Sequence, residues 1–100
     1  MDDLDYELLS WLAAGNSVFR PREATQEAEE AFREVVTRLA QLRDREQVDY
    51  LEGQVARTDG GIYLAVGPTE LTPAGKATLQ RVRRLGARPH RSPDSLPWRT

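Results

Sequence analysis

The sequence predicts a single α+β domain that contains a helix, a longer helical region, a β-hairpin and a final helix. Large apolar residues recur at helical spacing over residues 4–12 and 28–42. Asp59-Gly60-Gly61 separates two stretches rich in β-branched and aromatic residues, which is typical of a hairpin. A Leu-Thr-Pro sequence at 71–73 opens a last helical stretch. The chain has 100 residues, which is enough for one hydrophobic core and too few for two.

The first helix is expected from Asp3 to Ala14. Aspartates near its start favour the positive end of the helix dipole, and Gly15 with Asn16 ends it. Its apolar positions are Leu4, Leu8, Trp11 and Leu12.

The second helical region is expected to begin at Pro21, whose fixed backbone angle suits a first helical position. No glycine or proline interrupts the chain from Arg22 to Glu46. Nothing in the Ala-Glu-Glu-Ala sequence at 28–31 demands a turn, so the sequence leaves open whether residues 22–46 form one helix or two. The apolar stripe consists of Ala28, Ala31, Phe32, Val35, Val36, Leu39 and Leu42.

The hairpin is expected to pair Val48–Thr58 with Ile62–Val66, and Gly53 is a candidate bulge. With a two-residue loop, one face of the hairpin would be apolar and would pack on the helices. That face would contain Leu51, Val55, Ile62, Leu64 and Val66.

The last helix begins after Thr72, which is expected to cap its N-terminus, with Pro73 at the first helical position. Gly75 would allow its first turn to approach a neighbouring segment closely, because glycine has no Cβ. Leu79 and Val82 are expected to face the core.

The composition changes at Gly86. Residues 86–100 contain three prolines and no hydrophobic periodicity, so we expect a domain over residues 1–85 and a flexible, basic, proline-rich tail over 86–100. Trp98 could anchor this tail to a partner or a neighbouring subunit, or it could be incidental.

Composition excludes several classes of function. The chain has no cysteine and a single histidine, His90, so we expect no disulfide, metal site or cofactor. His90 lies in the expected tail, where nothing would hold it for catalysis, and no catalytic triad can be assembled, so an enzyme is not expected. No apolar run is long enough to span a membrane, so we expect a cytoplasmic protein.

Three groups of residues carry a family resemblance. Leu39, Leu42 and Val48 are typical of a recognition helix that runs into a strand, Asp59-Gly60-Gly61 is typical of a wing tip, and Leu71-Thr72-Pro73-Ala74-Gly75 with Leu79 is typical of the helix after the wing. Over residues 4–85 the chain therefore resembles the winged helix-turn-helix domain of MarR-like and PadR-like small bacterial transcriptional regulators. The resemblance implies a winged-helix-like fold, DNA binding and transcription regulation.

If the domain binds DNA, the expected contacts lie on the exposed face of the presumed recognition helix and on the wing. They are Arg33, Thr37, Arg38, Gln41 and Arg57. The alternative is an ordinary solvated helix face, because Glu29 with Arg33 and Glu34 with Arg38 are spaced as favourable ion pairs. The pI near 5.4 is also low for a DNA-binding domain.

The charge is unevenly distributed. Residues 1–50 hold 12 acidic and 6 basic residues, and residues 51–100 hold 4 acidic and 8 basic residues. We expect double-stranded DNA as a partner and a homodimer formed through the first helix at Trp11 or through the last helix. The alternative is a winged-helix protein-interaction module that binds no nucleic acid and meets another protein through its acidic helical face or basic tail.

Overall fold

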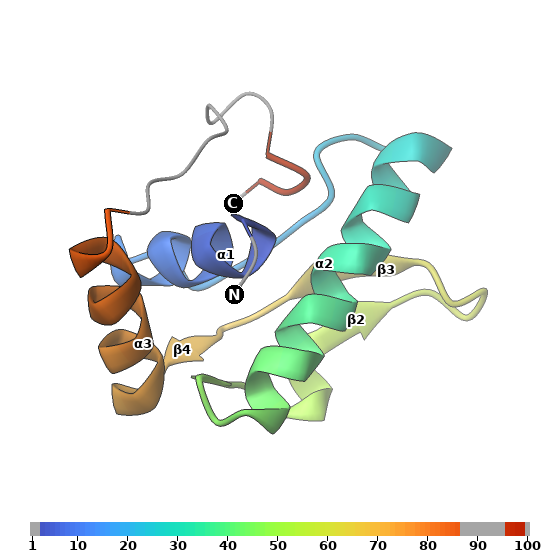
Figure 1. The fold of residues 1–100 in the computed structure, drawn as a ribbon. Helices are drawn as coiled ribbons and strands as arrows, with labels where there is room; N and C mark the ends of the chain where they lie inside the picture. Colours follow the sequence, from blue (N-terminus) through green and yellow to red (C-terminus); the bar gives the residue numbers. More distant parts are fainter. Residues whose placement is uncertain (1–2, 87–95, 100) are drawn as a thin grey trace.

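The computed structural model describes residues 3–86 and 96–99. It contains three helices and two small antiparallel sheets (Figure 1). The central helix α1 contacts α2 and α3, and α2 also contacts the β2–β3 hairpin. The predicted α+β class is confirmed, and the arrangement is consistent with a winged-helix-like small domain. None of the helices in the described ranges is long and apolar enough to cross a membrane.

Helix α1 (Asp3–Ala13) has nearly the predicted bounds. It ends before Gly15, which has a positive φ of 99° that favours glycine. The buried apolar residues of α1 are Leu4, Tyr6, Leu8, Leu9 and Leu12.

Helix α2 (Gln26–Asp44) is continuous, which answers the question that the sequence left open. Thr25 caps it, and its hydroxyl accepts a hydrogen bond from the Ala28 N–H at 3.2 Å. The predicted start at Pro21 is therefore wrong, because the cap places the first turn five residues later. The chain has no turn at 28–31, so the described residues contain no helix-turn-helix pair before the hairpin.

Strand β2 (Val55–Arg57) pairs with β3 (Tyr63–Val66). A short 3-10 turn, η1 (Glu52–Gln54), precedes β2 and contains Gly53, the candidate bulge. A register irregularity after Ala56 pairs Arg57 with Tyr63 and leaves Leu64 without a partner. The turn also spans more than two residues, since the Thr58 N–H donates to the Ile62 carbonyl.

The predicted apolar face of the hairpin is consequently wrong in part. Val66 is buried and Val55 packs against the core, as expected. The other three members are exposed: Leu51 at 68%, Ile62 at 37% and Leu64 at 51%. The bulge turns Leu64 outward, and Leu51 lies outside the strands, just before η1.

The sheet continues beyond the hairpin through isolated bridges. Phe19 pairs with Val66, and Arg20 pairs with Arg99, so residues 96–99 lie beside the segment that joins α1 to α2. Leu96 and Trp98 are buried in the core. The prediction of a flexible tail is corrected for residues 96–99, because their backbone pairs with Arg20 and Trp98 packs on aromatic side chains. The remainder of the expected tail, 87–95, lies outside the described residues.

Strand β1 (Val48–Asp49) pairs with β4 (Glu70–Leu71), which leads into α3 (Pro73–Arg84). The start of α3 confirms the prediction: the Thr72 hydroxyl accepts from the Gly75 N–H at 3.0 Å, and Pro73 occupies the first position. A Cβ on Gly75 would collide with the Gln47 carbonyl oxygen, so the close approach is confirmed as well. Leu79 is buried and Val82 packs against the core.

Candidate nucleic-acid interface

Three of the five predicted contacts lie on the exposed face of α2. Arg33, Thr37 and Gln41 are all exposed, and their four-residue spacing aligns them along the helix. The opposite face holds the buried residues Phe32, Val35, Leu39 and Leu42. Packing of that face on α1 and the hairpin therefore directs the polar stripe away from the core.

Acidic side chains flank this stripe. Glu30 and Glu34 are exposed on the same side of α2, and Glu30 accepts a 3.4 Å hydrogen bond from Gln26. Of the two predicted pairs, Glu34 and Arg38 lie 3.7 Å apart, whereas Glu29 and Arg33 form no ion pair within the described residues. Arg33 is thus available to an external acceptor, but carboxylates surround it.

Arg38 has a different environment. Its guanidinium lies 3.5 Å from the Asp5 carboxylate, whose side chain is only 8% exposed, and Arg45 approaches the same carboxylate at 4.0 Å. Arg38 is also less exposed than Arg33, Thr37 and Gln41. The structure therefore places Arg38 at the contact between α1 and α2, apart from the exposed stripe.

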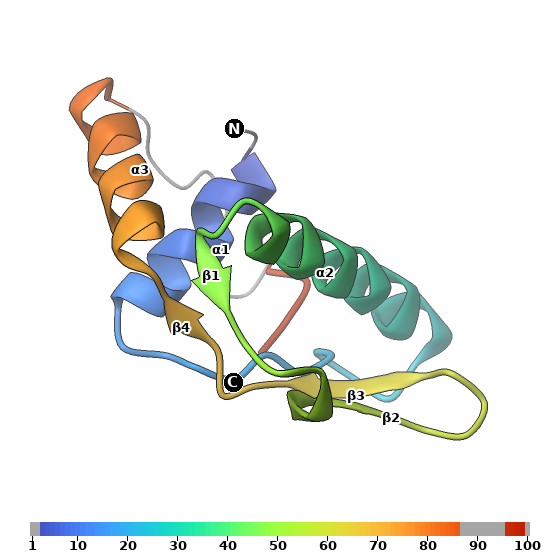
Figure 2. The ribbon, with the colours of Figure 1, turned by 90° about the horizontal axis from the view of Figure 1, so that it is seen from below.

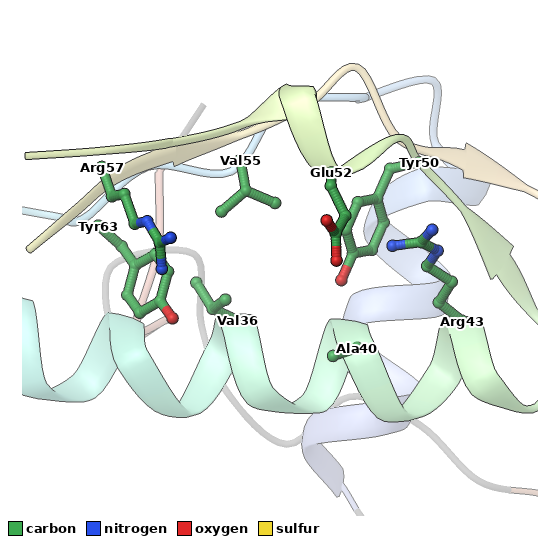
Figure 3. A pocket seen from close by; sticks show the side chains of 8 residues that line it. All are labelled: Val36, Ala40, Arg43, Tyr50, Glu52, Val55, Arg57 and Tyr63. Atoms are coloured by element: carbon green, nitrogen blue, oxygen red, sulfur yellow. The ribbon is translucent and has the colours of Figure 1, made fainter. Parts of the chain in front are cut away.

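Arg57 lies on β2 and points toward α2, close to Tyr63 (Figure 3). It lines a pocket of about 340 Å³ between α2 and the hairpin. The other lining residues are Val36, Ala40, Arg43, Tyr50, Glu52, Val55 and Tyr63. Arg57 is exposed to solvent at the mouth of this pocket and makes no ion pair within the described part of the chain. Arg33 lines a neighbouring hollow that shares Tyr63 with this pocket, so Arg33 and Arg57 approach the same part of the hairpin.

At the inner end of the pocket, the Arg43 guanidinium lies 4.9 Å from the centroid of the Tyr50 ring. Burial raises the pKa of the Tyr50 hydroxyl above its ordinary value, and the nearby Arg43 partly offsets this by favouring the phenolate. Tyr50 is therefore protonated at neutral pH and is part of the packing between α2 and β1. The sequence carried no periodic signal for this pair, because Tyr50 lies just outside a regular strand.

Helix α3 carries the most uniform positive charge. Lys76, Arg81, Arg83 and Arg84 are all exposed, and α3 contains no acidic residue. This helix lies at the other end of the molecule from the start of α2 (Figures 1 and 2). The basic surface and the polar stripe of α2 are thus separate.

The chain matches no known protein-family model, no curated protein and no solved structure.

Proposed function

We propose that this protein is a small DNA-binding transcription regulator of winged-helix type, with α2 as its reading helix. The observation that supports this proposal is the exposed stripe of Arg33, Thr37 and Gln41 beside the hairpin. The major groove of B-DNA admits an α-helix, and the three side chains offer different contacts there. Arginine suits guanine, glutamine suits adenine, and the threonine methyl group suits the thymine methyl group.

The contacts have distinct roles in this proposal. Arg33 and Gln41 reach base edges, while Arg57, at the pocket mouth, turns outward to a phosphate. The Thr37 hydroxyl already donates to the Arg33 carbonyl at 3.0 Å, so Thr37 contributes its methyl group. Arg38 positions α2 against α1 through Asp5 and does not read DNA.

The acidic flank sets the expected strength of binding. Glu30 and Glu34 repel phosphates, although a carboxylate can accept a hydrogen bond from cytosine. The helix before α2 is α1, and residues 14–25 separate the two, so α1 is not held to α2 by the short turn that places the first helix of a helix-turn-helix on the DNA backbone. We therefore expect modest affinity that decreases as the salt concentration rises, with a shallow slope because few phosphates are neutralised.

Fluorescence anisotropy with a pool of genomic duplexes at two salt concentrations tests the proposal. Arg33→Ala and Gln41→Ala should each weaken binding by about ten-fold, in line with about 1–3 kcal/mol for one base contact. Lys76→Ala is the matched control, since it removes one exposed cation at the far end of the molecule. Equal losses from Arg33→Ala and Lys76→Ala would indicate nonspecific attraction, and no binding of any duplex would overturn the proposal.

A second candidate is a protein-interaction module that binds no nucleic acid. The observation that favours it is the acidic flank of the α2 stripe, which would suit a basic protein surface better than DNA. Absence of DNA binding, together with capture of a basic partner that Glu30→Lys and Glu34→Lys abolish, would support this alternative.

A further inference from the structure

The two ends of this molecule carry opposite charge. Exposed glutamates gather at the start of α2 and just before it, at Glu23, Glu27 and Glu30. Exposed cations occupy α3. Figures 1 and 2 place the start of α2 and helix α3 at opposite ends of a body whose longest dimension is 42 Å. One chain therefore cannot bring its own acidic and basic ends together.

The acidic end is hollowed. One hollow of about 600 Å³ is lined by Glu23, Thr25, Gln26, Glu27 and Glu30. A neighbouring hollow of about 380 Å³ shares Gln26 and Glu30 and includes Ile62 of the hairpin turn, which is 37% exposed. Glu29, Arg33 and Tyr63 complete its lining, so one cation stands among the carboxylates there. Glu23, Glu27 and Glu30 form no ion pair within the described residues. The acidic end thus combines unpaired carboxylates with an apolar rim.

The basic end has the complementary chemistry. One face at the C-terminal end of α3 carries Arg81, Arg84 and Leu85, because residues three and four positions apart lie on the same side of a helix. Leu85 is 82% exposed, the highest value among the large apolar residues of the described chain. Neither Arg81 nor Arg84 forms an ion pair with another described residue. Two free guanidinium groups thus flank an exposed leucine.

We propose that the acidic end of α2 binds the α3 end of a second copy of this chain. The Arg81 and Arg84 side chains of one copy pair with Glu27 and Glu30 of the other, and Leu85 packs near Ile62. In this proposal two copies lie side by side and antiparallel, so that both contacts form at once; end-to-end contacts would instead add further copies. The product is a closed two-fold dimer.

The acidic surface shares Arg33 with the proposed reading helix but contains neither Thr37 nor Gln41. Self-association is measured without DNA, so its outcome is separate from that of the DNA-binding test. Single exposed ion pairs contribute little, so the dimer relies on two symmetric contacts and on low ionic strength. Analytical ultracentrifugation without DNA measures it directly. The wild-type chain should dimerise at about 0.05 M salt and should be mainly monomeric at about 0.5 M, where screening is stronger.

A charge-swap experiment identifies the surfaces. The double variant Arg81→Glu with Arg84→Glu should be monomeric, and so should Glu27→Lys with Glu30→Lys, because each places like charges at both contacts. Each should weaken self-association by at least about ten-fold. An equimolar mixture of the two variants restores opposite charges at both contacts, so a heterodimer should form with nearly the wild-type affinity.

Lys76→Glu is the control for net charge, because Lys76 lies on α3 but outside the Arg81–Leu85 face, and it should leave dimerisation unchanged. Circular dichroism verifies that each variant is folded, and the salt dependence of the wild-type chain requires no variant. A wild-type monomer at every salt concentration would overturn the proposal. Dimers that survive both charge reversals, or folded variants that fail to associate when mixed, would overturn it as well.

Discussion

The indole ring of Trp98 packs edge-on against that of Trp11, with ring centroids 5.9 Å apart and ring planes at 81°. Trp98 also meets Phe19 in a similar geometry, at 5.6 Å and 67°. Arg20 follows Phe19 and Arg99 follows Trp98, and two backbone hydrogen bonds between Arg20 and Arg99 hold these two segments together. Residues 96–99 therefore complete the core over α1, and Trp11 is partly covered by Trp98 of the same chain.

Truncation of Trp98 should be strongly destabilising. Trp98 is 2% exposed, and replacing a large buried aromatic residue by alanine costs about 3–5 kcal/mol. Urea unfolding of Trp98→Ala measures this loss. Leu85→Ala, at the most exposed large apolar position, should change the free energy of unfolding by less than about 0.5 kcal/mol. Similar stabilities for Trp98→Ala and the wild-type chain would mean that the 96–99 segment is not part of the folded core.

Gly75 should not tolerate a larger side chain. A Cβ there would collide with the backbone carbonyl of Gln47 and also crowd Leu71, and neither the strand end nor the helix can move freely. We expect Gly75→Ala to lower the free energy of unfolding by about 1–3 kcal/mol.

The matched control for Gly75 is Gly53→Ala. A Cβ on Gly53 meets no atom within 4 Å, and its φ is not positive. This substitution should be neutral or stabilise the protein by up to about 1 kcal/mol, because alanine has less conformational freedom in the unfolded chain. Equal losses of stability from the two substitutions would contradict the close approach of Gly75 to Gln47, the residue just before β1.

Local signals made much of the fold predictable. The cap at Thr72, the close approach at Gly75 and the bounds of α1 each depend on a few adjacent residues, so sequence alone indicated them. The outward turn of Leu64 is not predicted, because a single bulge interrupts the alternation of side chains at Leu64 and leaves no clear mark in the sequence. The burial of Trp98 was missed because its partners lie near the other end of the chain.

The candidate site was predictable to the same extent. Helical periodicity places Arg33, Thr37 and Gln41 on the exposed face, and the structure agrees. Periodicity cannot show which neighbouring element covers the edge of a helix. It therefore grouped Arg38 with the exposed stripe, although Asp5, from a separate helix, holds its guanidinium.

Arg38 and Arg33 should consequently differ in what they do. Arg38→Met removes a guanidinium that lies 3.5 Å from the Asp5 carboxylate, whose side chain is 8% exposed, so we expect a loss of about 1–3 kcal/mol in the free energy of unfolding. Arg33→Met should change stability by less than about 0.5 kcal/mol, since Arg33 is exposed. Urea unfolding compares the two variants. A larger stability loss for Arg33→Met than for Arg38→Met would contradict the structural role of Arg38.

The pKa of Tyr50 predicts a pH dependence. Burial raises this pKa above the ordinary value of 10.0, so the folded state holds the phenol proton more tightly than the unfolded chain does. The resulting stability is fully present below about pH 10 and decreases as the pH rises toward the pKa of the folded state. Tyr50→Phe removes the titrating group and keeps the ring beside Arg43.

Urea unfolding of both proteins from about pH 8 to about pH 11 isolates this effect, because titration of the other groups is common to both. The stability of the wild-type chain relative to Tyr50→Phe should be constant at the lower end and should then fall by at most about 1.4 kcal/mol per pH unit. A relative stability that rises as the pH approaches 10 from below would show that the neighbouring Arg43 outweighs burial. A flat profile would show that Tyr50 is more accessible to water than its packing against α2 indicates.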